Sequence, residues 1–192
     1  MIIHLNGWPG VGKQTIGRIL AQNLNARFIH NHLLHDVAIV CCGINDPDRW
    51  AVYDVVRRTA YDALAKRPPG ETFVMTNALC KGALRESDAW KHVVDLAIKR
   101  NAALVPVVLA VESKELFRRL QSAERVGRKM TDPVLLDAFL ETDELQRPAV
   151  AERLDVEVTG LSAKDAAAQI EKHIAAIRPD LAPATKMHLE LL

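Results

Sequence analysis

The segment "GWPGVGKQT" (residues 7–15) follows the apolar run "MIIHLN" (residues 1–6) and comes before a stretch with helical spacing. Residues 1–6 have the composition of a buried strand, and Ile16, Leu20 and Leu24 recur as on one face of a helix. A glycine-rich turn between a strand and a helix presents backbone N–H groups and the positive end of the helix to a polyphosphate. The segment therefore predicts a phosphate-binding loop at the start of an α/β protein.

This loop departs from the usual pattern G-x-x-x-x-G-K-[ST] at one position. Gln14 stands where a hydroxyl normally contacts magnesium, and the hydroxyl comes one residue later, on Thr15. We expect Lys13 to neutralise the β- and γ-phosphates. We expect Mg²⁺ to be held mainly by phosphates and waters, with Thr15 as an indirect contact. The residues expected to bind the nucleotide phosphates are Gly7, Pro9, Gly10, Val11, Gly12, Lys13, Gln14 and Thr15. The alternative is a purely structural turn, which gives the lysine after Gly12 no purpose.

The remainder of the chain alternates strand-like and helix-like segments. We expect strands at 26–30, 72–77, 103–111 and 155–160, and helices at 33–42, 46–67, 90–98, from 113 onward and after Ser162. A strand–helix order repeated about five times predicts an α/β fold with a five-stranded parallel sheet and helices on both faces. Pro106 is unusual in a central strand, because proline has no N–H to donate.

Composition and charge favour a soluble globular protein. Of the 192 residues, 49% are hydrophobic and 26% are charged, which suits one domain with a substantial core. We expect this domain to span residues 1–178, followed by a tail at 179–192, in a monomer or a homodimer. The formal net charge of +1 gives no basic field for nucleic acid, and no run approaches the ~20 apolar residues of a membrane span.

The cysteines indicate a reducing compartment. There are three, Cys41, Cys42 and Cys80, and an odd number with two adjacent argues against a disulfide framework. We expect all three to be small buried residues. The chain begins directly with a strand-like run and shows no export signal, so the expected location is the cytoplasm.

The loop resembles that of adenylate kinase and related nucleoside monophosphate kinases, where GxPGxGKGT also lacks a hydroxyl directly after the lysine. The layout of residues 1–178 resembles the wider group of small P-loop kinases, such as shikimate kinase, gluconate kinase, chloramphenicol phosphotransferase and the tunicamycin-resistance protein. The resemblance implies a three-layer P-loop NTPase fold with a small lid, here at about residues 121–135. It also implies ATP and Mg²⁺ as cofactors, ADP as product and a small hydroxyl compound as acceptor.

Two segments resemble nucleotide contacts of these kinases. The basic segment "RRLQSAERVGRKM" (118–130) lies where a lid supplies arginines to the phosphates, and we expect Arg125 and Arg128 to do so. A solvated basic face is the alternative. The turn in "VTGLSAKDAA" (158–167) resembles the segment that packs against adenine, which implies backbone contacts from Thr159 and Gly160. The alternative there is an ordinary capped helix start.

Acceptor-binding residues are expected after the second and third strands, because ligands of open α/β sheets bind at the carboxyl edge. Shikimate and gluconate kinases carry an aspartate near "HNHLLHD" (30–36) that orients or deprotonates the acceptor hydroxyl. The first acid here is Asp36, and His32, with a pKa near neutrality, is the other candidate base. A metal site formed by His32, His35 and Asp36, or histidines that only form hydrogen bonds, remain alternatives.

Three further residues complete the expected acceptor site. Asn31 follows the second strand, and Asn77 stands after the third strand where many P-loop proteins hold magnesium through an acid. Arg57, in the helix at 46–67, is positioned for an anionic acceptor, although an exposed polar face explains it equally well. Trp50 and Tyr53 in the same helix are either core residues or a stacking platform.

The sequence thus favours an ATP-dependent kinase acting on an unidentified small acceptor. Because Gln14 and Asn77 replace the usual groups near magnesium, a nucleotide-binding regulator that transfers no phosphate is the alternative. A kinase acting on nucleic-acid ends is disfavoured by the near-zero net charge.

Overall fold

The computed structural model describes residues 1–81, 84–121 and 144–177. The expected lid, with Arg125 and Arg128, and the tail at 179–192 lie outside these residues, apart from Gln121. In chain order the elements are β1 (Ile2–Gly7), α1 (Lys13–Asn23), β2 (Arg27–His30), α2 (His32–Cys42), α3 (Arg49–Ala65), β3 (Phe73–Thr76), α4 (Leu84–Lys99), β4 (Leu104–Ala110), α5 (Ser113–Leu120), β5 (Leu154–Glu157) and α7 (Ala163–Ile177).

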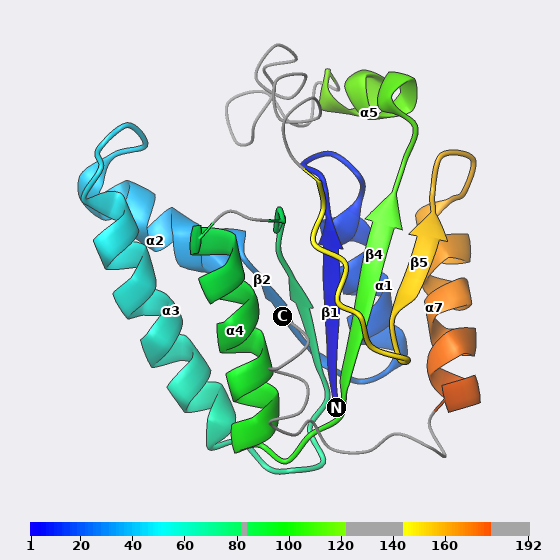
Figure 1. Cartoon of the computed structure of the whole chain (residues 1–192), viewed down its shortest axis with the longest axis horizontal. Coiled ribbons are helices and arrows are strands. Elements are labelled where there is room, and N and C mark those ends of the chain that lie inside the picture. The colour runs from blue at the N-terminus through cyan, green and yellow to red at the C-terminus, as the bar shows by residue number, and fades with distance from the viewer. Residues whose placement is uncertain (82–83, 122–143, 178–192) are drawn as a thin grey trace.

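The five strands form one sheet in the order β2-β3-β1-β4-β5, and every pairing is parallel. Helices α3 and α4 cover one face, and α1 and α7 cover the other (Figure 1). The predicted α/β fold with a five-stranded parallel sheet between two helical layers is therefore confirmed. The loop after β1 and helix α5 lie together at the carboxyl end of the strands (Figure 1).

Side chains of β1 alternate between two hydrophobic cores. Ile2 packs with the cluster under α3 and α4, whereas Ile3 and Leu5 pack with the cluster under α1 and α7. All three are fully buried, as expected for the central strand of a sheet covered on both faces. This double burial anchors the strand that carries the phosphate loop.

Pro106 is accommodated by the stagger of the sheet. The backbone carbonyl of Ala103 accepts a hydrogen bond from Ile2 N of β1, and that of Ala110 accepts one from Val158 N. The backbone N–H and C=O groups of the even-numbered residues of β4 therefore point toward β5. The pairing with β5 begins only opposite Val107. The missing N–H of Pro106 therefore points to a side where no strand requires it.

Some local expectations are confirmed and others are wrong. The last helix begins with the predicted cap, since Asp165 N donates to Ser162 Oγ at 3.1 Å. Cys80 is buried, but Cys41 is exposed and Cys42 is half-buried, so the expectation of three buried cysteines is wrong. The apolar run of α2 is longer than one face of the helix can bury, and Cys41 falls on the solvent side. No helix in the described ranges is long and apolar enough to cross a membrane.

Candidate active site

The phosphate loop combines three glycines with left-handed backbone conformations. The φ angles are 154° at Gly7, 99° at Gly10 and 109° at Gly12. A Cβ atom on Gly10 would lie 3.0 Å from Leu116 Cδ1 of α5, so this glycine is required by packing as well as by backbone conformation. Val11 N donates to Trp8 O at 3.2 Å and closes the turn.

Lys13 points back across the loop that precedes it. Its ammonium nitrogen donates to Gly7 O at 2.5 Å and to Trp8 O at 2.9 Å. Carbonyl oxygens are neutral acceptors, and a phosphate oxygen offers the lysine a charge-assisted bond of greater strength. The side chain is thus held at the loop, ready to exchange these acceptors for a phosphate.

One cavity of about 390 Å³ joins the phosphate loop to the expected acceptor side. From the loop and α1 it receives residues that the sequence predicts to bind phosphates, and from β2, α2, α3 and the end of β3 it receives polar and aromatic side chains. The lining residues used below are Gly10, Gly12, Lys13, Gln14, Thr15, Asn31, His32, His35, Trp50, Tyr53, Arg57 and Asn77. Six of the eight residues predicted to bind phosphates therefore line the same cavity as the predicted acceptor residues, whereas Gly7 and Val11 do not line it.

Arg57 is a buried cation at this cavity. Only 4% of its side chain is exposed, and its ion pair within the described ranges, at 2.9 Å, is with Asp54, which is itself 47% exposed. Within the described part of the chain, its Nε and Nη1 atoms have no hydrogen-bond acceptor. A buried guanidinium with unfilled donors favours binding of an anion. The alternative of an exposed polar face is therefore wrong for Arg57, although Arg58 is exposed.

Aromatic side chains form a wall beside Arg57. His35 stacks on Tyr53 with ring centroids 4.0 Å apart, and Trp50 meets both rings edge-on. Tyr53 also donates a hydrogen bond of 2.7 Å to Asn31 Oδ1. Burial, with a smaller contribution from His32, lowers the pKa of His35 to about 4, so its ring is neutral at pH 7. Trp50 and Tyr53 line the cavity as well as packing against the core.

Asn77 is held from behind by a buried histidine. His4 Nε2 lies 3.0 Å from Asn77 Oδ1, and the ring of His4 meets Trp90 edge-on. Burial lowers the pKa of His4 to about 4, which keeps the ring neutral. This contact orients the amide that faces the cavity. This role of His4 was not predictable from the sequence, because a lone histidine in an apolar run gives no signal of its own.

The described residues that line the cavity include no carboxylate. Asp36 is exposed and does not line it, whereas Asn31, His32 and Asn77 do. Lys81 lies away from it, in an exposed pair with Glu144. Nor do any three His, Cys, Asp or Glu side chains of the described residues gather closely enough to hold a metal ion. The potential Mg²⁺ ligands are hydroxyl and amide oxygens such as those of Thr15 and Gln14. This is consistent with a metal held chiefly by phosphates.

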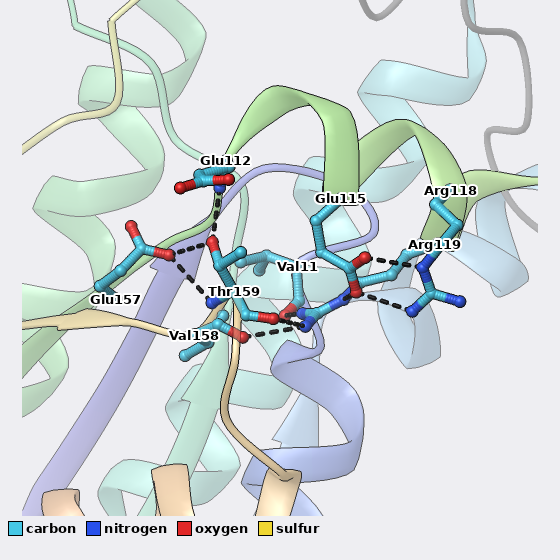
Figure 2. A network of polar contacts seen from close by, with 8 residues as sticks. All are labelled: Val11, Glu112, Glu115, Arg118, Arg119, Glu157, Val158 and Thr159. Atoms are coloured by element: carbon cyan, nitrogen blue, oxygen red, sulfur yellow. Dashed lines mark hydrogen bonds and ion pairs between the residues drawn. The ribbon is translucent and has the colours of Figure 1, made fainter.

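Thr159 and Gly160 lie outside the cavity, in the turn between β5 and α7. Thr159 is held through both its backbone N and its hydroxyl. Its backbone N donates to Glu157 Oε1 at 2.9 Å, its hydroxyl donates to the same oxygen, and the hydroxyl accepts from Glu112 N at 2.8 Å (Figure 2). The turn is thereby tied to the start of α5, next to the phosphate loop.

Solved structures similar to this fold include three that are named as kinases of small molecules. A gluconokinase from Sinorhizobium meliloti 1021 is 22% identical, with 93% of each chain covered and a TM-score of 0.62. A sugar kinase from Janibacter sp. HTCC2649 is 20% identical, with 95% of this chain and 96% of that chain covered and a TM-score of 0.59. A shikimate kinase from Acinetobacter baumannii, in complex with shikimate, is 19% identical, with coverages of 91% and 93% and a TM-score of 0.59.

These likenesses show that the chain has the fold of the small P-loop kinases, as its loop and layout predict. No protein-family model and no curated protein matches the sequence.

Proposed function

We propose that the protein is an ATP-dependent phosphotransferase that moves the γ-phosphoryl group of ATP to a hydroxyl of a small acceptor. The observation that carries this proposal is the single cavity shared by Lys13 of the phosphate loop and the polar residues Asn31, His32 and Asn77. Phosphoryl transfer depends mainly on position and charge, and this cavity brings a cation beside groups able to orient a hydroxyl.

In the proposed reaction, the acceptor oxygen attacks the γ-phosphorus, and the bond to the β,γ-bridging oxygen breaks. ADP leaves with the electron pair of that bond. His32 accepts the hydroxyl proton, because it lines the cavity whereas Asp36 does not. Lys13, and in the proposal Arg125 and Arg128, neutralise the phosphate oxygens. Mg²⁺, when bound with the nucleotide near Thr15, would add positive charge at the β- and γ-phosphates.

We further propose that the acceptor carries an anionic group bound by Arg57. The Nε and Nη1 atoms of Arg57, which have no acceptor among the described residues, support this assignment, since a buried guanidinium with unfilled donors is stabilised by an anion. His35, Tyr53 and Trp50 supply an apolar wall beside it. Together these groups favour an acceptor with one charged end and a less polar body.

The test incubates the protein with ATP, Mg²⁺ and a panel of hydroxyl compounds, and measures acceptor-dependent release of ADP. Each anionic compound is paired with its neutral amide or ester, so that the effect of the charge is measured directly. We expect ADP release with an anionic acceptor and much less with its neutral partner.

A regulator that binds the nucleotide without transferring phosphate is the second candidate, favoured by the lack of a carboxylate among the described lining residues. ATP binding without ADP release for any acceptor would favour that candidate.

A further inference from the structure

Arg119, near the end of α5, joins two loops that are far apart in the sequence. Its Nη1 donates to Val11 O of the phosphate loop at 3.1 Å. Its Nη2 donates to Val158 O at 2.9 Å and to Thr159 O at 3.3 Å, in the turn between β5 and α7 (Figure 2). All three bonds end on backbone carbonyls, so the contact depends on the position of Arg119 rather than on the side chains it meets.

The guanidinium is itself held in place. Arg119 Nε donates to Glu115 Oε1 at 2.7 Å, one turn earlier on α5. Hydrogen bonds from Arg118 and Arg119 lower the pKa of Glu115 to about 2, so this carboxylate is ionised at neutral pH. All three guanidinium nitrogens of Arg119 are therefore engaged, and the planar group has little freedom to turn.

The bond to Val11 determines the direction of the next N–H group. In a planar trans peptide the C=O of one residue and the N–H of the following residue point in opposite directions. Because Arg119 holds the Val11 carbonyl toward α5, the Gly12 N–H is directed away from α5. Gly12 lines the cavity, and no acceptor in the described part of the chain takes this N–H. The same geometry applies at the other end of the guanidinium. Arg119 binds the carbonyl of Thr159, so the N–H of Gly160 points in the opposite direction.

We propose that Arg119 is a positioning residue of the nucleotide site. It orients the Gly12 N–H for a phosphate and fixes the distance between the phosphate loop and the turn at 158–160, where the nucleotide base is expected. This inference rests on the proposed function, because it concerns the same nucleotide. It assigns to an arginine outside the cavity a role that acts through the backbone.

Arg118 provides a matched control. It shares Glu115 with Arg119, through bonds of 2.6 and 2.7 Å, but its side chain is 74% exposed and contacts neither loop. Replacement of either arginine by methionine keeps much of the aliphatic stem and removes the donors. The comparison of the two variants thus separates loss of charge on α5 from loss of the contact between the loops.

The first experiment measures the affinities of ATP and of inorganic tripolyphosphate by calorimetry for the wild type, Arg119→Met and Arg118→Met. We expect Arg119→Met to bind both ligands about tenfold more weakly and Arg118→Met to stay within about twofold, since only the former loses hydrogen bonds to the loop. Circular dichroism verifies folding. If Arg119→Met does not fold, Arg119→Lys, which keeps the charge and one donor group, replaces it.

A second experiment does not depend on any ligand. Amide hydrogen exchange is followed in segments 8–13 and 158–161 of the nucleotide-free protein. We expect both segments to exchange faster in Arg119→Met, while exchange in the strands of the sheet stays unchanged. We expect neither segment to change in Arg118→Met. A residue that supports only general stability would raise exchange throughout the protein.

The outcomes distinguish the two proposals. Equal affinities in the wild type and Arg119→Met overturn the role of Arg119. A lower affinity of Arg119→Met for ATP with unchanged affinity for tripolyphosphate also overturns that role, because it indicates a direct contact between Arg119 and the base. A wild type that binds neither ligand overturns the proposed function and the nucleotide role of Arg119 with it. In that case the exchange data still show whether Arg119 joins the two loops, and unchanged exchange overturns that part as well.

Discussion

The ammonium nitrogen of Lys13 lies 2.9 Å from the carbonyl oxygen of Trp8, five residues earlier in the same loop. A second carbonyl, that of Gly7, lies at 2.5 Å. The lysine therefore closes the loop on itself, and these two carbonyls are neutral acceptors that a phosphate can replace.

Lys13→Ala is expected to weaken ATP binding by about 100-fold or more, because the principal cation of the loop is removed. Calorimetry with ATP measures the loss. Lys99→Ala is the control, since Lys99 is exposed and its ion pair among the described residues is with Asp62, at 3.1 Å. Unchanged ATP affinity in Lys13→Ala would contradict the assignment of the phosphate loop.

Arg57→Met tests the anion site. We expect KM for an anionic acceptor to rise about 100-fold, because a buried charged hydrogen bond is lost, while ATP affinity stays the same. The thermal midpoint should stay equal or rise, because the change removes a buried cation with unfilled donors and leaves the half-exposed Asp54 in contact with water. Arg58→Met, at an exposed position of the same helix, is the control. A similar KM for both variants would refute the role of Arg57.

Replacement of Gln14 and Thr15 identifies which of the two side chains lies near the metal. We expect Thr15→Val to raise the Mg²⁺ concentration needed for half-maximal ADP release several-fold, and Gln14→Ala to leave it nearly unchanged. Removal of Mg²⁺ with EDTA should abolish ADP release in every variant. The opposite order, with Gln14→Ala more sensitive to Mg²⁺, would assign the metal contact to the amide.

His4 should make stability dependent on pH. Its pKa is about 4 in the folded protein and 6.5 as an ordinary value, so between these values the unfolded chain binds the proton more strongly. The contribution of His4 is therefore fully present above pH 6.5 and is lost as the pH falls toward 4, at about 1.4 kcal/mol per pH unit and about 3 kcal/mol in total.

Urea unfolding of the wild type and His4→Gln between pH 7 and pH 4.5 measures this loss. The variant should show a smaller decline in the free energy of unfolding, by about 2 to 3 kcal/mol over this range. His35 titrates in both proteins, so its contribution cancels in the comparison. Parallel pH profiles for the two proteins would show that His4 is not held neutral by burial.

The strand–helix order and the phosphate loop were predictable because both depend on local information. A buried strand, a glycine-rich turn and an apolar helix face leave periodic patterns in short segments. The exposed Cys41 and the tolerated Pro106 were not predictable, since each depends on which neighbouring element covers a given side. A charged residue such as Arg57 has the same sequence signal whether it lies in solvent or in a cavity.

The parallel α/β architecture and the position of Lys13 at the start of the first helix could both be predicted from the sequence. Three relationships depend on how the elements pack: His4 supports Asn77, Arg57 is buried with donors unfilled by the described residues, and Arg119 joins residues 11 and 158–159. The physical reason is that the contacts of His4 and Arg119 join residues that are 39 to 108 positions apart in the sequence. The burial of Arg57 depends on other elements that pack against its helix. No local pattern records a contact that arises only when the sheet is assembled.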